Sequence, residues 1–197
     1  LPLPDSKWIT LVQLLTLIGT ILQKQRDGMG MLEINEKGSH FFESKATSEW
    51  MKLMLSHLSK KDGERKKNAN IAFEIEALMS KIPRRSQVIL FIDLFQEELE
   101  KILNAAALLA FEGHSVRCAF ISHAKLEQNE EYFAGKQVID SETGSKAYIN
   151  QTDAKRYVSF VEAQKEWAIT MSRNLNLNCE ILDASHEPMY LLRELLA

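Results

Sequence analysis

Cysteine is scarce in this sequence of 197 residues, which contains only Cys118 and Cys179. Two thiols this far apart do not build a disulfide framework, and the lack of a Cys-x-x-Cys or Cys/His spacing argues against a zinc site. We therefore expect a reducing compartment, the cytoplasm. Both cysteines should be buried structural residues, because free cysteine behaves as a small hydrophobic residue.

Long apolar runs and a strong net charge are also missing. The most apolar stretch, residues 8–22, is interrupted by Thr10, Gln13 and Thr16, and falls short of the ~20 continuous apolar residues that cross a membrane. No basic segment with a small-residue cleavage site indicates a signal peptide. The net charge of −3 provides no global field for nucleic acid. We expect no membrane contact by this chain and no nucleic-acid partner, and a membrane segment before residue 1 is left open.

The sequence does have the alternating helices and strands of one α/β domain over residues 1–197. Its 45% hydrophobic and 26% charged residues are ordinary for a globular protein of this length. Periodicity and turn residues predict, in order, helix 7–25, strands 28–34 and 39–44, helices 49–58 and 70–81, strand 86–93, helix 97–112, strand 115–121, a hairpin of 136–140 and 146–150, a helix opened by Thr152 or Asp153 and ending near 174, strand 178–182, and a helix from Pro188 to about 196.

The run at residues 86–93 is apolar at consecutive positions, which suits a parallel strand covered on both faces. Strand 86–93, helix 97–112, Gly113 and strand 115–121 form a βαβ unit, which predicts a parallel pair. Gly28-Met29-Gly30 follows a helix and enters a strand, so it is not a dinucleotide-binding fingerprint.

Two further groups of residues are candidates for binding. His123 follows a strand directly, at the edge where ligands bind in parallel sheets. The other histidines are scattered and lie near no serine or cysteine suited to nucleophilic work: His40, His57, His114 and His186. A basic cluster is typical of a solvated loop, and the sharper alternative is contact with an acidic partner; it comprises Lys60, Lys61, Arg65, Lys66 and Lys67.

The order of elements and several short motifs resemble a bacterial family of unknown function that carries a von Willebrand factor A-like domain. Members are often encoded beside MoxR-type AAA+ ATPases. The resemblance implies a three-layer, Rossmann-like α/β fold: a mostly parallel sheet, helices on both faces and one antiparallel edge strand. The matching segments are 85–93, 113–116, 138–144, the helix around Tyr157, 182–188 and 191–196, with 7–25 and 26–32 upstream.

The same resemblance implies that one strand is absent from this sequence. The family places its first strand in the middle of a six-stranded sheet. Residues 1–5 contain two Leu-Pro pairs, and proline removes hydrogen-bond donors that a central strand needs. We therefore expect an N-terminally incomplete domain, whose central strand comes from before Leu1 or from a second chain.

Domains of this type often hold a divalent cation at the C-terminal ends of the strands, through an Asp-x-Ser-x-Ser loop, a threonine and an aspartate. The resemblance places that aspartate at Asp93 and the threonine position at Ala69, which cannot ligate, while Asn68 or Asn70 could contribute weakly. We expect a degenerate site without metal. Asp93 could equally cap the turn after its strand, where Glu97 and Glu98 also favour a helix start.

Together these features predict a protein-interaction module without enzymatic activity or cofactor. The resemblance implies an adaptor or chaperone-system partner of a MoxR-type AAA+ ATPase. The expected binding edge consists of Asp93, Asn70, Asn68 and His123. The alternative is a hydrolase or nucleotide-binding enzyme of doubly wound fold at the same edge. That enzyme needs a glycine-rich loop after a strand, or a nucleophile with its base, and the sequence shows neither.

Overall fold

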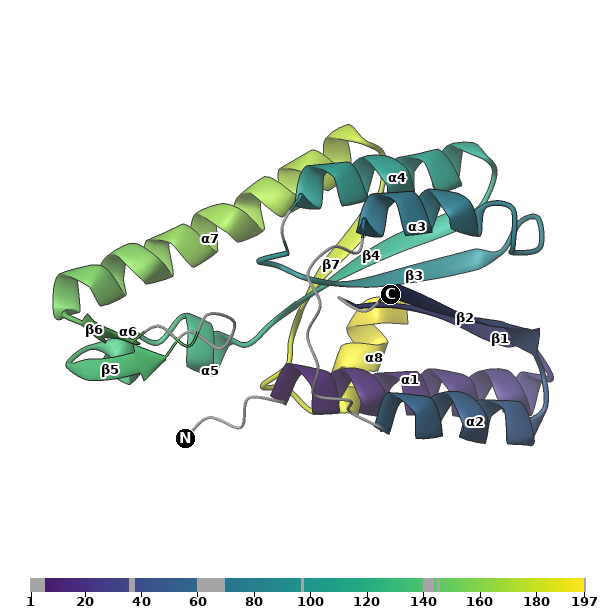
Figure 1. Cartoon of the computed structure of the whole chain (residues 1–197), viewed down its shortest axis with the longest axis horizontal. Coiled ribbons are helices and arrows are strands. Elements are labelled where there is room, and N and C mark those ends of the chain that lie inside the picture. Colours follow the sequence, from purple (N-terminus) through teal and green to yellow (C-terminus); the bar gives the residue numbers. More distant parts are fainter. Residues whose placement is uncertain are drawn as a thin grey trace.

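The computed structural model describes residues 6–35, 38–59, 70–96, 98–139, 144 and 146–196, and these form three layers (Figure 1). One face of the central strands is covered by α3 (Ile71–Leu78), α4 (Leu99–Phe111) and the C-terminal half of α7 (Gln151–Asn174). The opposite side carries α1 (Ser6–Gln25), α2 (Ser48–Ser59) and α8 (Pro188–Leu196). The predicted α/β class is confirmed.

The centre of the fold is a parallel sheet with the strand order β3 (Gln87–Asp93), β4 (Ser115–Ser122), β7 (Asn178–Asp183). The register pairs Leu90 with Cys118 and Cys118 with Cys179, so the two cysteines are neighbours on adjacent strands. Both thiols are free; Cys118 is buried as predicted, whereas Cys179 is only partly buried. Burial, and next the neighbouring Cys179, raise the pKa of Cys118 to about 12, which keeps this thiol protonated and unreactive.

Side chains that alternate along β4 fill two cores, one on each face of the sheet. Val116, Cys118 and Phe120 face the core beneath α3, α4 and α7. Ala119 and Ile121 face the core shared with α1 and α8. The fully buried residues of these cores include Leu14, Leu103, Leu109, Phe120, Leu182, Leu191 and Leu195. Each such side chain contributes roughly 1.5–3 kcal/mol through burial, so the two cores hold the layers together.

Two antiparallel hairpins stand apart from the parallel sheet. β1 (Met29–Asn35) pairs with β2 (Gly38–Lys45), and β5 (Lys136–Ile139) pairs with β6 (Lys146–Ile149). Gly30 lies inside β1, where a Cβ would stand 2.9 Å from the carbonyl oxygen of Phe42. Glycine is thus required there by strand pairing, consistent with the prediction that Gly28-Met29-Gly30 is no nucleotide loop.

The predicted mostly parallel, six-stranded sheet is not continuous in the structure. The described strands divide into a β1-β2 sheet, a β3-β4-β7 sheet and a β5-β6 sheet. Among the described residues no strand lies between β1 and β3. Residues 1–5 lie outside the described ranges, so the absence of a central strand stays a prediction.

A protruding arm was only partly predicted. The arm, as we use the term, consists of the short helices α5 (Ala124–Glu127) and α6 (Glu130–Phe133), the β5-β6 hairpin, and residues 151–160 of α7. The remaining described residues form the body. The arm extends away from the three layers (Figure 1). The sequence predicted the hairpin and α7 but neither short helix. Asn150 caps α7 by accepting the main-chain N–H of Asp153 at 2.9 Å, in place of the predicted Thr152 or Asp153.

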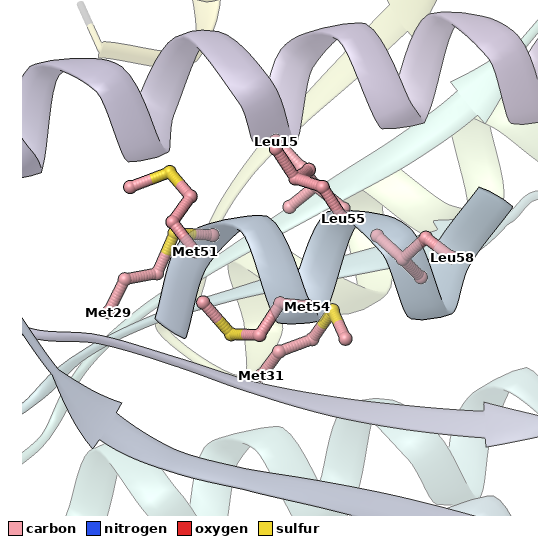
Figure 2. Close-up of a pocket in the computed structure, with 7 residues that line it drawn as sticks. All are labelled: Leu15, Met29, Met31, Met51, Met54, Leu55 and Leu58. Carbon is pink, nitrogen blue, oxygen red and sulfur yellow. The ribbon is translucent and has the colours of Figure 1, made fainter. Parts of the chain in front are cut away.

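The helices α1 and α2 meet β1 at a small hollow lined by aliphatic and thioether side chains (Figure 2): Leu15, Met29, Met31, Met51, Met54, Leu55 and Leu58. Its volume is about 10 Å³, about the space of one water molecule, and such apolar hollows stay dry. A Cβ on Gly19 would lie 2.2 Å from Sδ of Met51, so glycine permits the close approach of the two helices. The hollow is therefore a packing feature between the two helices and β1.

Within the described ranges, none of the helices has the length and apolar content needed to cross a membrane.

Candidate functional site

The C-terminal ends of β3, β4 and β7 bring polar residues to one edge of the sheet. Asp93 ends β3, His123 follows β4, and Asp183 ends β7. Parallel strands in register necessarily end at the same edge, which is where ligands bind in open α/β sheets. The predicted residues Asp93 and His123 are therefore brought to one region of the molecule.

A lysine from the first turn of α1 lies between two carboxylates at this edge. Nζ of Lys7 lies 3.1 Å from Oδ2 of Asp93 and also contacts Oε1 of Glu127. The side chain of Lys7 is 24% exposed, that of Asp93 47% and that of Glu127 11%. We call Lys7, Asp93 and Glu127 the charged cluster. It carries one positive and two negative charges, so it remains net negative with the ammonium in place.

Asp93 also performs the local role considered from the sequence. Its Oδ1 accepts the main-chain N–H of Phe95 at 2.9 Å, which caps the turn after β3. Its other oxygen, Oδ2, binds Lys7. The carboxylate is thus fixed in orientation while about half of its surface stays open to solvent.

His123 lies behind the charged cluster. The residue is 9% exposed, and its main-chain N–H donates to Oε2 of Glu127 at 2.9 Å. Its ring nitrogen Nδ1 has no hydrogen-bond partner among the described residues. The structure therefore gives His123 a buried position that holds Glu127, rather than the exposed position expected of a direct contact with a partner.

The other predicted edge residues do not join this cluster in the described structure. Asn70 is exposed and caps α3 by accepting the main-chain N–H of Phe73 at 3.1 Å. Asn68 and Ala69 lie outside the described residues, as do Glu97 and the basic cluster from Lys60 to Lys67. Predictions about these residues stay predictions.

The remaining histidines serve other parts of the molecule. Nε2 of His57 lies 2.6 Å from Oε2 of Glu33. The His57 ring also stacks on the ring of His40, with 4.6 Å between the ring centroids. His114 is buried at the start of β4, and His186 packs edge-on against Tyr190.

A row of aromatic rings adjoins the charged cluster and links the body to the arm. Phe95 stacks with Tyr157 at 6.4 Å and with Phe160 at 6.0 Å, and Tyr157 packs edge-on against Phe133 at 5.1 Å. The ammonium of Lys7 lies 5.6 Å from the centre of the Phe95 ring. Phe160 is 55% exposed, so the row opens to solvent. We call Phe95, Phe133, Tyr157 and Phe160 the aromatic row.

Tyr157 lies within the electrostatic field of the charged cluster. Burial, followed by the negative charges of Glu127 and Asp93, raises the pKa of Tyr157 to about 12. Its phenol therefore stays neutral at physiological pH.

Asp183 has a structural role at the same edge. Its Oδ1 accepts the N–H groups of Ala124 and Ser185, and its Oδ2 accepts the Ser185 hydroxyl. Burial alone would raise the pKa of Asp183, but these hydrogen bonds and the nearby His186 outweigh it and lower the pKa. The carboxylate is occupied in holding the loops after β4 and β7.

In the part of the chain that the structure describes, no three His, Cys, Asp or Glu side chains gather so as to hold a metal ion. Asp93 and Glu127 instead contact the Lys7 ammonium. The arrangement is suited to binding a charged group beside exposed rings, and it lacks a positioned nucleophile among the residues just described.

Residues 4–168 match the profile of a family described as "Protein of unknown function DUF58". No curated protein matches the sequence. Among solved structures, the chain is similar to the crystal structure of the conserved hypothetical protein BatB from Bacteroides thetaiotaomicron, with 12% identity and a TM-score of 0.40 over 81% of this chain and 87% of that chain. A likeness at this level carries no argument about function.

Proposed function

We propose that this chain, which belongs to the DUF58 family, is a protein-interaction module that binds its partner at the C-terminal edge of the parallel sheet. The proposal includes a von Willebrand factor A-like fold, with Asp93 at the position of the family's aspartate ligand and the metal site degenerate. It is supported by the three-layer arrangement, in which the loops after β3 and β4 meet at one edge (Figure 1).

The observation that carries the proposal is the contact between the charged cluster and the aromatic row. Interfaces between proteins are enriched in aromatic side chains, and a few side chains near the centre of the interface contribute most of the binding energy. Phe160 is 55% exposed and Tyr157 37% exposed, beside a half-open Asp93 carboxylate. Exposed rings of this kind have a cost in water that a partner would remove.

The chemistry of the edge favours a basic group on the partner. The charged cluster is net negative, and Asp93 is its most accessible carboxylate. An arginine or lysine of the partner could bind Asp93 while lying against the aromatic row, since cations are attracted to ring faces. Lys7 already makes both contacts, with Asp93 and with the ring of Phe95.

For the partner itself, the family resemblance supports a MoxR-type AAA+ ATPase, with this chain as adaptor or chaperone-system component. We propose that the chain has no catalytic activity of its own. The proposal places it in the cytoplasm, where such an ATPase has access to ATP.

Calorimetric titration of a MoxR-type AAA+ ATPase into this protein tests the proposal. Phe160→Ala and Asp93→Asn should each weaken binding by at least about tenfold, as expected for central interface residues. Phe111→Ala is the matched control, because Phe111 is also a helical phenylalanine, is 85% exposed, and lies at the opposite end of the sheet. Equal losses in Phe111→Ala and Phe160→Ala, or no loss in either, would contradict this interface.

The metal part of the proposal has its own readout. Binding should have the same Kd in excess magnesium and in EDTA, because the Lys7 ammonium already neutralises part of the carboxylate charge. A Kd that rises steeply in EDTA would show that a cation takes part and would contradict a degenerate site.

A further inference from the structure

Lys7 occupies the position at which the proposed interface would receive a cation from a partner. Its ammonium lies 3.1 Å from Oδ2 of Asp93, contacts Oε1 of Glu127 and lies 5.6 Å from the centre of the Phe95 ring. Carboxylate oxygens and a ring face are the contacts that a basic group of a partner would use at this edge. The chain therefore fills this position with a cation of its own.

The same ammonium connects the body to the arm. Lys7 comes from α1 and Asp93 from β3, both in the body, whereas Glu127 belongs to α5 in the arm. The other oxygen of Glu127, Oε2, accepts the main-chain N–H of His123. Loss of the ammonium would leave two like charges close together at the boundary between body and arm, and like charges repel.

Lys7 is held here against the preference of its own helix. The N-terminal end of an α-helix carries a partial positive charge, which favours acidic side chains in the first turn and disfavours cations. α1 begins at Ser6, has no acidic residue in its first turn and has Lys7 there. The two carboxylates therefore offset a local cost, and a cation supplied by a partner would not have that cost.

The ammonium is also accessible enough to leave the cluster. The side chain of Lys7 is 24% exposed and that of Asp93 47%. Lysine has a flexible four-carbon stem, so Nζ can turn into solvent while the helix stays in place. Water and salt compete with ion pairs of this exposure. Exchange for another cation thus requires rotations within one side chain and leaves both cores closed.

We propose that Lys7 is a displaceable internal cation, which closes the interface in the free protein and is replaced by an arginine of the partner, an inference that rests on the proposed function. Arginine is the stronger competitor, because its planar guanidinium can donate to both carboxylates and stack on a ring, whereas an ammonium is a compact point charge. The stacked rings of Phe95 and Tyr157 lie beside the position that the guanidinium would take.

An internal cation has a measurable consequence for affinity. A protein that binds only while Lys7 is turned away has its apparent affinity reduced to the fraction of molecules in that state. Lys7→Met keeps the apolar stem and removes the competing charge. It should bind an arginine about five- to tenfold more tightly than the wild type. A lysine that only held Asp93 in position for the partner would give the opposite result, weaker binding.

An NMR titration with N-acetyl-arginine amide as the probe tests this prediction without the ATPase. Lys24→Met is the matched control, because it removes the same charge from the last turn of the same helix. Lys24 lies about 25 Å along the helix from Lys7, beyond the Debye length of about 8 Å, so its loss should leave the affinity unchanged. Lys7→Arg retains a cation and should bind no more tightly than the wild type. Adding Asp93→Asn to Lys7→Met should abolish the gain.

Two further readouts do not depend on a gain in affinity. In the wild type, saturation with the probe should move the Lys7 Cε resonance to that of a lysine in solvent. In Lys7→Met without probe, the Gln128 amide of α5, which donates to the Ala124 carbonyl, should exchange at least about threefold faster. Exchange in β4 should stay unchanged, which shows that the variant is folded.

The outcomes separate this inference from the proposed function. Equal or weaker binding of the probe by Lys7→Met, binding by neither protein, or an unmoved Lys7 resonance at saturation would overturn the internal cation. ATPase binding that depends on Phe160 and Asp93 would then still support the interface. Tighter binding of the probe by Lys7→Met, without any binding of the ATPase, would instead support the internal cation and contradict the proposed partner. If N-acetyl-lysine amide binds Lys7→Met as tightly as the arginine probe, the preference for arginine is wrong.

Discussion

The body and the arm are built from the same kinds of elements but are held in different ways. In the body, every residue of β4 from Cys118 to Ser122 is buried. In the arm, β5, β6 and α6 contain no buried residue among those described. The body is maintained by two cores, whereas among the described residues of the arm only Glu127 and Ala154 are buried, and ring contacts and helix caps hold the rest.

If the proposed function is right, this difference separates the residues that stabilise the fold from those that bind a partner. Residues that contribute most to folding, such as Phe120, are inaccessible to a partner. The rings that could contribute most to binding, such as Phe160, bury too little to contribute much to folding. Regions with few buried contacts also open locally at low free-energy cost. The arm can therefore change shape or sequence without endangering the body.

The largest expected effect comes from removing one aromatic ring from the body and, for comparison, one from the arm. Phe120→Ala should lower the free energy of unfolding by about 3–5 kcal/mol, because a fully buried ring leaves a cavity. Phe160→Ala, at 55% exposure, should change it by less than about 1 kcal/mol. Urea unfolding followed by circular dichroism measures both. Similar losses would mean that the arm is part of the cooperative core.

A second substitution tests how tightly the body is packed away from the sheet. Gly19→Ala should cost at most about 2 kcal/mol, since its Cβ would stand 2.2 Å from Sδ of Met51, a flexible side chain that can move, and alanine favours the helix by about 1 kcal/mol. The Met51→Ala background provides the control, because the clash is removed there. In a double-mutant cycle, the double variant should cost less than the sum of the two single variants. Additive costs would place the strain elsewhere.

The arm should respond locally to the loss of a helix cap. Asn150→Ala should remove about 1 kcal/mol from the first turn of α7, because its side chain accepts the Asp153 N–H. Native-state hydrogen exchange should show faster exchange in that turn and unchanged exchange in β4. Thr152→Ala is the control in the same turn and should have little effect. If β4 exchange also accelerates, the arm and the body unfold together.

The smallest expected effect is a pH dependence that belongs to the aromatic row. The pKa of Tyr157 is raised from 10.0 to about 12 in the folded protein, so its contribution to stability is complete below pH 10 and is lost between about pH 10 and 12. Because burial and the charges of Glu127 and Asp93 disfavour the phenolate, the unfolding free energy of the wild type should fall relative to that of Tyr157→Phe as the pH rises through that window. Cys118 and Tyr190 titrate in both proteins, so only the difference between the two reports on Tyr157. A difference that is constant with pH would contradict this assignment.

Most of the body was predictable because its elements are long and their apolar patterns are strong. The consecutive apolar residues of 88–92 identified a two-sided parallel strand, and Pro188 marked the first turn of the last helix. The short helices α5 and α6 have four residues each, too few to show a helical period. The cap of α7 was misassigned because Asn150, Thr152 and Asp153 can all cap, and only tertiary position decides among them.

The site was predictable only in part. Asp93 and His123 could be placed at one edge from the strand directions alone. Lys7 lies 86 residues from Asp93 in the sequence, and no local sequence pattern around either residue predicts their contact. Glu127 was missed because it belongs to α5. Asn70 shows a further difficulty, since an asparagine suits a helix cap as well as a ligand position.

The length of α7 has a mechanical consequence. Its 24 residues span about 36 Å, from the tip of the arm to the start of β7. Ala168, near the C-terminal end of α7, is buried in the core of the body and anchors the helix there. Phe160 lies nearer to the N-terminal end of α7, which is the free end at the tip of the arm. A tilt of about ten degrees around the anchored end would swing the free end by about 6 Å for a rod of that length. A small rearrangement in the body would therefore produce a larger displacement at the tip of the arm. Conversely, a force applied at the tip would exert a torque on the core of the body.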